Sequence, residues 1–356
     1  MAPQHSDRSR LIASLVVVCS ALFPLISCAS LTHTQSAPTP RSGIRPATDP
    51  VFNSPVSAIP YEDHVLESDA RYSLRRVTFP SVAENGQIDN LVTVDYHQSR
   101  LPGCHPAVIV LPIRGRHVYP SNAITRTLRK RSNGRVHVLN VLGTDFLIDW
   151  PKLGALTDES EFVDTWIEGA EHEIATLIDI RRLIDWAESR PEIDADRIAL
   201  IGFSHGAMLA PAVVAQESRI AATVLVMGGA HPQEIAARCN GERTRRSQLI
   251  ALGAFGWDQD ELEARLEPVF QHVDSANYPG RADPSRVLVF EAGKDRCVPE
   301  SAREALWLIM GRPERYTIHA DHHRAFYSMT PLGFNWLRRR VWDFFERKLV
   351  EEPGAR

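Results

Sequence analysis

The sequence has few cysteines, five among its 356 residues. It contains no Cys-x-x-Cys pair and no Cys/His spacing typical of a zinc site, so nothing in it indicates a bound metal. Cys19 and Cys28 belong to the N-terminal segment discussed below, which leaves Cys104, Cys239 and Cys297. An oxidising compartment would allow one disulfide among these three and leave one thiol over, and the sequence does not say which pair forms.

An excess of positive charge is also lacking. The formal net charge is −4, with 44% hydrophobic and 24% charged residues, an ordinary balance for a globular protein. This composition gives no indication of a nucleic-acid partner. The basic run Arg338-Arg339-Arg340 lies in an amphipathic C-terminal segment and is interpreted as a solvated helix face. No internal repeat is present.

No apolar run is long enough to span a membrane. The longest runs from Leu11 to Ile26, follows the small positive region of Arg8 and Arg10, and is typical of a secretory signal peptide. The two arginines are not adjacent, so a twin-arginine signal is not supported. The segment predicts export from the cytoplasm.

The end of this run, Leu25-Ile26-Ser27-Cys28, resembles the bacterial lipobox. The resemblance implies cleavage before Cys28 and lipid attachment to that cysteine, so residues 1–27 would be the signal peptide. The protein would then be anchored by lipid to a membrane of the bacterial cell envelope. The alternative is an ordinary cleaved signal peptide, cut near Ala29 or Ser30.

Residues 28–69 are predicted to be a flexible tether. From Ala29 to about Pro60 the chain is rich in Ser, Thr and Pro and has few large apolar residues, so it buries too little surface to offset the entropy of ordering. Residues 70–350 remain as one domain, a normal size for a single α/β enzyme.

The body alternates strand-like and helix-like segments. An antiparallel hairpin is expected over 75–79 and 91–96, followed by buried strands near 107–111, 136–141, 197–201, 222–226, 286–291 and 315–319. Helices are expected over 121–131, 168–188, 299–310 and 334–349. The alternation predicts a mostly parallel central sheet with helices on both faces. Residues 231–283, with helices near 231–238 and 259–272, are longer than one crossover requires. They form either a partial cap over the site or a longer surface excursion.

One pentapeptide indicates the chemistry, Gly202-Phe203-Ser204-His205-Gly206. It lies between a predicted strand and a predicted helix, which is the nucleophile-elbow pattern. Its two glycines allow a sharp turn that lifts the Ser204 hydroxyl out of the sheet. The alternative is a glycine-rich connection with an idle serine.

From about residue 72 to 349 the chain resembles the α/β-hydrolase superfamily, particularly its dienelactone-hydrolase-like and prolyl-oligopeptidase-like branches. The resemblance is carried by the elbow, by the approach to it from Ile184, and by Ala292-Gly293-Lys294-Asp295-Arg296-Cys297-Val298-Pro299, similar to the family's acid loop. It implies an α/β-hydrolase fold and a triad in the order Ser, acid, His. Asp295 would be the acid.

The base would come from His319-Ala320-Asp321-His322-His323. Alignment on the family's usual turn selects His322, with His323 and then His319 as rivals. A metal bound to this histidine cluster is the disfavoured interpretation. The oxyanion hole would use the backbone N–H of His205 and one from the loop Pro112–Gly115, with Arg114 preferred to Ile113.

These features predict a cofactor-free serine hydrolase that cleaves a small ester or related acyl substrate through an acyl-enzyme. Two alternatives remain. A prolyl-oligopeptidase-type peptidase would need an N-terminal propeller, for which residues 29–70 are too short. A non-catalytic envelope binding protein on the same scaffold is the other. The aromatic residues Trp150, Trp166, Phe255 and Trp257 either line a pocket or belong to the core.

Overall fold

The computed structural model describes residues 31–34, 49–53, 59–82, 91–113, 119–143 and 148–351, with the side chains of 31–34 left aside. The signal peptide and Cys28 therefore lie outside the described residues. The strands are β1 (Leu31–Thr34), β2 (Glu62–Ser68), β3 (Tyr72–Pro80), β4 (Leu91–Ser99), β5 (His105–Val110), β6 (His137–Val141), β7 (Ile193–Phe203), β8 (Ile220–Val226), β9 (Val287–Ala292) and β10 (Glu314–Ile318).

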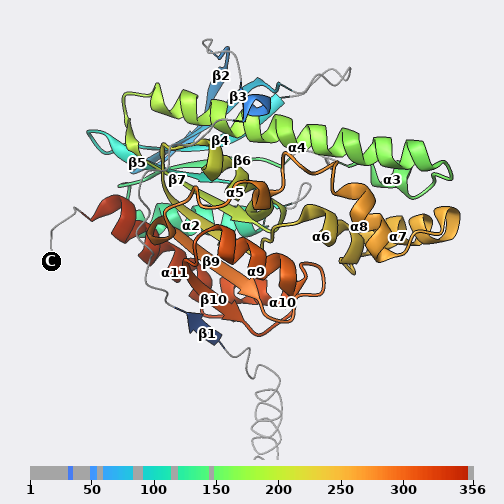
Figure 1. The fold of residues 1–356 in the computed structure, drawn as a ribbon. Coiled ribbons are helices and arrows are strands. Elements are labelled where there is room, and N and C mark those ends of the chain that lie inside the picture. Colours follow the sequence, from blue (N-terminus) through green and yellow to red (C-terminus); the bar gives the residue numbers. More distant parts are fainter. Residues whose placement is uncertain are drawn as a thin grey trace, which may run out of the picture.

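Helices connect and cover these strands (Figure 1). The α-helices are α2 (Tyr119–Ser132), α3 (Trp150–Leu153), α4 (Glu159–Glu188), α5 (His205–Gln216), α6 (Pro232–Arg238), α7 (Glu242–Phe255), α8 (Gln259–Leu266), α9 (Glu300–Ile309), α10 (His322–Ala325) and α11 (Trp336–Phe345). Shorter helical turns are η2 (Pro50–Phe52), η3 (Ser275–Asn277), η4 (Pro284–Arg286), η5 (Phe326–Met329) and the π-helical η6 (Glu346–Val350). Within the described residues, no helix combines the length and the apolar character needed to cross a bilayer.

All ten described strands form one sheet, in the order β1-β10-β9-β8-β7-β5-β6-β4-β3-β2. The pairs from β10 through to β6 are parallel, and β4, β3, β2 and β1 are added antiparallel at the two sides. The predicted mostly parallel sheet with helices on both faces is confirmed. Parallel strands end at the same edge, so the segments that follow β5, β7, β8, β9 and β10 meet there.

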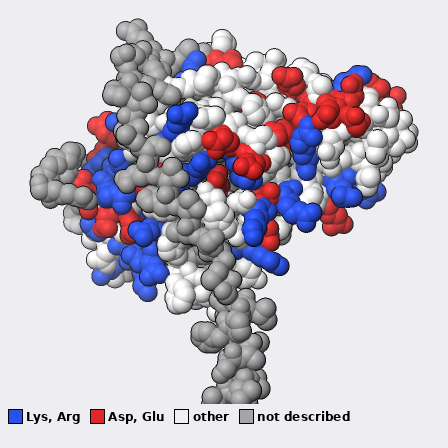
Figure 2. Space-filling view, turned by 60° about the horizontal axis from the view of Figure 1, so that its bottom comes forward, with Lys and Arg blue, Asp and Glu red and all other residues white. Residues whose placement is uncertain are grey.

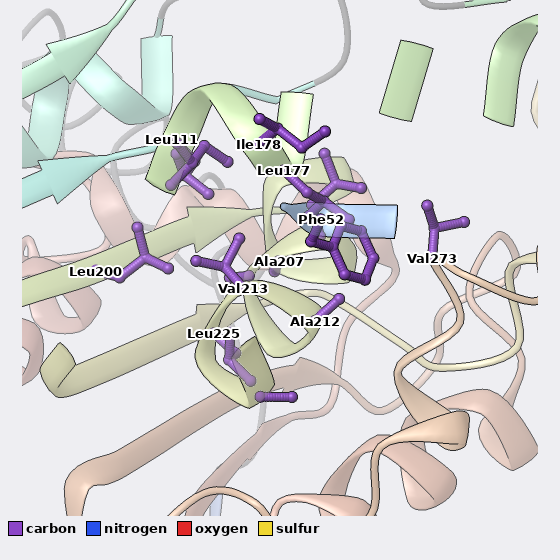
Figure 3. Close-up of a cluster of buried hydrophobic side chains, with 14 of the residues drawn as sticks. Phe52, Leu111, Leu177, Ile178, Leu200, Ala207, Ala212, Val213, Leu225 and Val273 are labelled. Atoms are coloured by element: carbon purple, nitrogen blue, oxygen red, sulfur yellow. The ribbon is translucent and has the colours of Figure 1, made fainter. Parts of the chain in front are cut away.

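The central strands are buried on both faces, which explains their continuous apolar sequences. Along β5, Val108 and Val110 face a core with α2 and α11, whereas Ala107 and Ile109 face a core with α4 and α5. Figure 3 shows the second of these cores, in which Leu200 of β7 lies among side chains from α4 and α5. The two cores hold the helices that carry the candidate site in fixed positions against the sheet.

The helix expected near 259–272 ends early, at Leu266, and α4 and α7 differ more from the sequence-based expectation. α4 begins nine residues before the predicted start at 168, because Asp158 caps it by accepting a hydrogen bond from the Glu161 N–H (3.0 Å). α7 occupies most of the stretch between the two helices predicted in 231–283. Its exposed Leu249 and Leu252 obscure the apolar periodicity by which a helix is recognised. Together α6, α7 and α8 lie at the end of the sheet where α4 begins (Figure 1).

The folded body also takes in part of the range predicted to be a tether. Within 28–69 the structure describes β1, η2 and β2, which pair with β10, pack against α4 and pair with β3, respectively. Phe52 of η2 is almost completely buried in the core. The boundary at residue 70 is therefore wrong for these elements. A Ser/Thr/Pro-rich composition does not reveal a single aromatic anchor of this kind.

Candidate active site

The elbow serine lies in the sharp connection between β7 and α5. Ser204 has φ 48° and ψ −113°, a strained conformation for a residue with a side chain. A Cβ on Gly202 would lie 2.2 Å from the carbonyl oxygen of Gly206, so only glycine permits this turn. The Ser204 N–H donates to the carbonyl of Val226 at the end of β8 (2.8 Å), which ties the turn to the neighbouring strand.

The structure brings Ser204, His322 and Asp295 into one hydrogen-bonded chain. The Oγ atom of Ser204 lies 3.1 Å from Nε2 of His322, and Nδ1 of His322 lies 2.6 Å from Oδ2 of Asp295. An ionised carboxylate only accepts hydrogen bonds, so Nδ1 carries a proton and donates it. Nε2 is then left as the acceptor for the serine hydroxyl. This is the arrangement in which an imidazole can take a proton from a hydroxyl.

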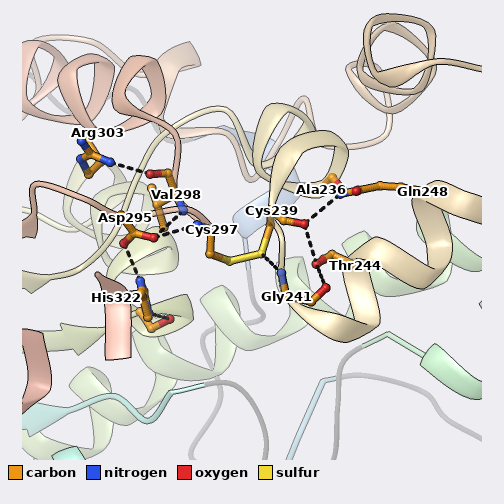
Figure 4. The surroundings of a disulfide bond; sticks show 11 residues. Ala236, Cys239, Gly241, Thr244, Gln248, Asp295, Cys297, Val298, Arg303 and His322 are labelled. Atoms are coloured by element: carbon orange, nitrogen blue, oxygen red, sulfur yellow. Dashed lines mark hydrogen bonds and ion pairs between the residues drawn. A yellow bond between two sulfur atoms is a disulfide. The ribbon is translucent and has the colours of Figure 1, made fainter. Parts of the chain in front are cut away.

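The Asp295 carboxylate is held by the backbone of its own loop. Its Oδ1 accepts hydrogen bonds from the N–H groups of Cys297 (2.8 Å) and Val298 (3.0 Å), as Figure 4 shows together with His322. Burial alone would raise the pKa of Asp295, but the hydrogen bond and charge of His322 and these two N–H donors outweigh it, and the pKa is lowered. The acid is therefore ionised at neutral pH.

A disulfide lies directly beside this acid loop. It joins Cys239, at the end of α6, to Cys297, while Cys104 is free and exposed. The pairing that the sequence left open is thus Cys239 with Cys297. The bond links the α6–α8 segment covalently to the loop that orients Asp295 (Figure 4).

The rival histidines lie on either side of His322. His323 follows it on α10 and is exposed, with its ring edge-on to the His322 ring at 5.8 Å between centroids. His319 lies just past the end of β10, although the sequence placed it inside the strand. Of the three, His322 is the one whose ring bridges Ser204 and Asp295.

The predicted oxyanion donors are placed in part. His205 is the first residue of α5, so its backbone N–H belongs to the free N-terminal turn of that helix. Arg114 and Gly115 lie outside the described residues, whereas Pro112 and Ile113 are described. A Cβ on Gly206 would lie 2.5 Å from the Pro112 carbonyl oxygen. The loop after β5 therefore packs directly against the elbow.

Comparison with known proteins relates the chain to hydrolases. The family model for phospholipase/carboxylesterase matches residues 150–264, a span that contains the elbow. A comparison with curated proteins finds no match. Two acetyl xylan esterases have similar structures. That from Paenibacillus sp. R4 gives a TM-score of 0.58 at 19% identity, covering 84% of this chain and 91% of that one. That from Thermoanaerobacterium sp. JW/SL YS485 gives 0.55 at 15%, covering 81% and 90%.

An acylaminoacyl peptidase from Pyrococcus horikoshii is also similar, with a TM-score of 0.52 at 14% identity. The match covers 80% of this chain but only 43% of that peptidase. Sequence identities this low establish a shared fold and not a shared substrate. The chain has the α/β-hydrolase fold.

In this α/β-hydrolase fold one buried contact of the elbow escaped the sequence analysis. Nε2 of His205 lies 2.8 Å from Oε1 of Glu173, in the middle of α4, and both side chains are buried. The contact fixes the side chain of the residue whose N–H is the predicted oxyanion donor. The sequence does contain a feature that could have revealed this contact, because Glu173 occupies the buried stripe of α4 four residues before Leu177. A carboxylate in such a stripe needs a partner.

The four aromatic residues considered as pocket lining belong to the core of the α/β-hydrolase domain. Trp150, Trp166 and Trp257 are buried, and Phe255 packs against the same core. The rings of Trp150 and Trp166 meet edge-on, with 5.6 Å between their centroids. Among the residues that the structure describes, no group of three or more His, Cys, Asp and Glu side chains is placed to hold a metal ion.

Proposed function

We propose that this protein is a serine hydrolase that cleaves an ester or related acyl bond through an acyl-enzyme intermediate. The observation that carries the proposal is the hydrogen-bonded chain from Ser204 through His322 to Asp295, with Ser204 on a strained elbow. The family match around the elbow and the esterase neighbours support it.

In the proposed reaction His322 takes the proton from the Ser204 hydroxyl as the oxygen attacks the acyl carbonyl. Asp295 holds the imidazole in the required tautomer and stabilises its positive charge. The N–H of His205 and a second N–H from the loop after β5 would stabilise the tetrahedral oxyanion. His322 then returns the proton to the leaving group, and water, activated in the same way, releases the acyl group from Ser204.

A peptidase activity is the second candidate, supported by the similarity to the acylaminoacyl peptidase. The esterase neighbours are matched over nine-tenths of their length, whereas this peptidase is matched over 43%. The structural similarity therefore favours the esterase proposal over the peptidase proposal. We further propose, from the lipobox-like sequence alone, that Cys28 carries lipid and anchors the enzyme to the cell envelope.

A fluorophosphonate probe tests the function, because it labels only an activated serine. We expect the wild-type protein to be labelled and Ser204→Ala to be unlabelled and to lose roughly 10⁴-fold or more of its turnover of short-chain aryl esters. Ser285→Ala is the matched control, because it removes an exposed serine hydroxyl that does not belong to the Ser204–His322–Asp295 chain. It should react as the wild type does. A wild-type protein that neither takes the probe nor hydrolyses esters would instead be a binding protein on this scaffold.

A further inference from the structure

Four large apolar side chains are exposed around the segment that follows the candidate base. They are Tyr119, Tyr327, Leu332 and Phe334, named here the apolar rim, and Leu332 and Phe334 are 71% and 77% exposed. α10, which bears His322, continues directly into η5, and η5 packs against α2 and α11. Tyr119 begins α2, on the loop that leaves the carboxyl end of β5. The rim therefore lies at the active-site end of the α2/α11 layer.

The backbone next to part of this rim is in an unfavourable conformation. Phe334 and the next residue, Asn335, have φ values of 55° and 51°, a left-handed conformation that is unusual for a phenylalanine. A Cβ on Gly333 would lie 2.1 Å from the Tyr327 carbonyl oxygen, so the two ends of this segment are packed tightly together. A strained backbone that exposes an aromatic side chain indicates a functional constraint on that side chain.

Behind the rim, the α2/α11 layer is basic. α2 contains no acidic residue, and Arg338 of α11 donates to the Ala123 carbonyl of α2 (3.1 Å), which places the two helices side by side. Their exposed cations, named here the basic belt, are Arg126, Lys130, Arg131, Arg339 and Arg340. Figure 2, which brings the lower face of Figure 1 forward, shows several groups of blue Lys and Arg side chains in its lower half, with some red Asp and Glu among them. The helix layer on the other face of the sheet is acidic, since α4 is rich in Asp and Glu.

The register of β1 places the start of the described chain at the same end. Leu31 pairs with Ile318, the last residue of β10, after which the chain enters the segment that bears His322. Cys28 precedes Leu31 by three residues, which span at most about 10 Å. If Cys28 carries lipid as proposed above, the anchor emerges from the active-site end of the sheet.

We propose that the apolar rim and the basic belt together form a docking surface for an anionic phospholipid membrane. The rim would insert between the lipid headgroups, where exposed apolar surface is removed from water, and the belt would meet their phosphates. Charge complementarity selects this occupant, because an apolar protein partner would leave the belt without anions. Docking presents the candidate active site to the membrane surface.

Hydrogen exchange of the full chain, in the Ser204→Ala form so that no lipid is turned over, tests the proposal on vesicles. We expect amides of residues 326–336 and of the start of α2 to be protected on vesicles of phosphatidylglycerol and phosphatidylcholine. Amides of α7 should exchange as they do without vesicles. A chain that sediments with these vesicles without protection at 326–336, or that does not sediment, overturns the proposal. Protection that instead rises with protein concentration in the absence of lipid would assign the surface to a second copy of the chain.

Matched variants separate this surface from the N-terminal segment, which is identical in all of them. Leu332→Ser with Phe334→Ser should lower the vesicle partition coefficient about tenfold, whereas Leu249→Ser with Leu252→Ser, which also removes two exposed apolar side chains but on α7, should not change it. Arg126→Glu with Arg339→Glu should abolish the preference for anionic vesicles, and Arg243→Glu with Arg245→Glu should preserve it. Equal partition of all four pairs contradicts the proposal. Hydrolysis of a soluble ester by the same variants should be unchanged, so this inference and the proposed function can fail separately.

Discussion

At the scale of single residues, the elbow combines strain with tight hydrogen bonding. Ser204 keeps an unfavourable backbone conformation because Gly202 and Gly206 approach within contact distance and because its N–H is bonded to β8. The serine oxygen is thereby fixed with respect to His322, and His322 is fixed by Asp295. Side-chain substitutions along this chain should affect turnover far more than stability.

The adjacent histidines give the sharpest residue-scale prediction. His322→Ala should cost roughly 10⁴-fold in ester turnover, because its ring alone bridges the serine and the acid. His323→Ala removes an exposed ring and should retain most of the activity. The two variants are compared by ester turnover at equal folded fraction, measured by circular dichroism. An inactive His323→Ala beside an active His322→Ala would reverse the assignment.

Two buried histidines predict a loss of stability in mild acid. Burial lowers the pKa of His97 and of His137 to about 4 in each case, whereas an unfolded histidine titrates near 6.5. His137 is satisfied as a neutral ring, since Nδ1 accepts from the Ser99 N–H (3.0 Å) and Nε2 donates to the Glu192 carbonyl (2.9 Å). Between pH 6.5 and 4 the unfolded chain binds more protons, so stability falls as the pH falls.

The expected slope is about 1.4 kcal/mol of unfolding free energy per pH unit for each histidine, measured by denaturant titration at several pH values. The hydrogen bond that His231 donates to the Asp274 carboxylate raises the pKa of His231. Its stabilising contribution is therefore complete below pH 6.5 and falls only as the pH rises above that value, so it does not change the slope between pH 6.5 and 4. His97→Asn should show a shallower slope than the wild type. An unfolding free energy that is constant from pH 6.5 to 4.5 would contradict this account.

At the scale of elements, much of the fold and of the candidate site could be predicted because both follow from local patterns. Buried parallel strands are continuous apolar runs, and the elbow and acid loop are short motifs, so Ser204 and Asp295 were found where strands end. Contacts between distant elements were not readable. α7 packs against α3, α6 and α8, which its own sequence does not reveal, and the partner of Glu173 is His205, which lies on another helix.

The disulfide gives the element-scale prediction. Cys239 and Cys297 are separated by 58 residues, and closing a loop of that size in the unfolded chain stabilises a protein by about 4 kcal/mol in the chain-entropy model. Cys239→Ser with Cys297→Ser should therefore lower the unfolding free energy by up to about that amount. Turnover should also fall, because the disulfide holds in place the loop in which the backbone N–H of Cys297 donates to Asp295. Cys104→Ser serves as the control, and equal stability of both variants would mean that the bond contributes nothing.

At the scale of the whole molecule, the main prediction is that lipid on Cys28 attaches the chain to a membrane, and it rests on the sequence alone. Wild-type protein produced in its host should stay in the membrane fraction after a wash with high salt and alkaline carbonate, which removes proteins bound only through surface charge. Cys28→Ser should be released by that wash or remain uncleaved. Wild-type protein that the wash removes completely would rule out the lipid but not the enzyme.

The two helix layers also bear on how the molecule behaves as a charged body. Its net charge of −4 averages over a basic face formed by α2 and α11 and an acidic one formed by α4. Charge separated across the sheet gives the molecule a dipole, and a dipole is turned by a field before any contact forms. At neutral pH and low salt the protein should therefore bind to cation-exchange and anion-exchange resins alike, through opposite sides.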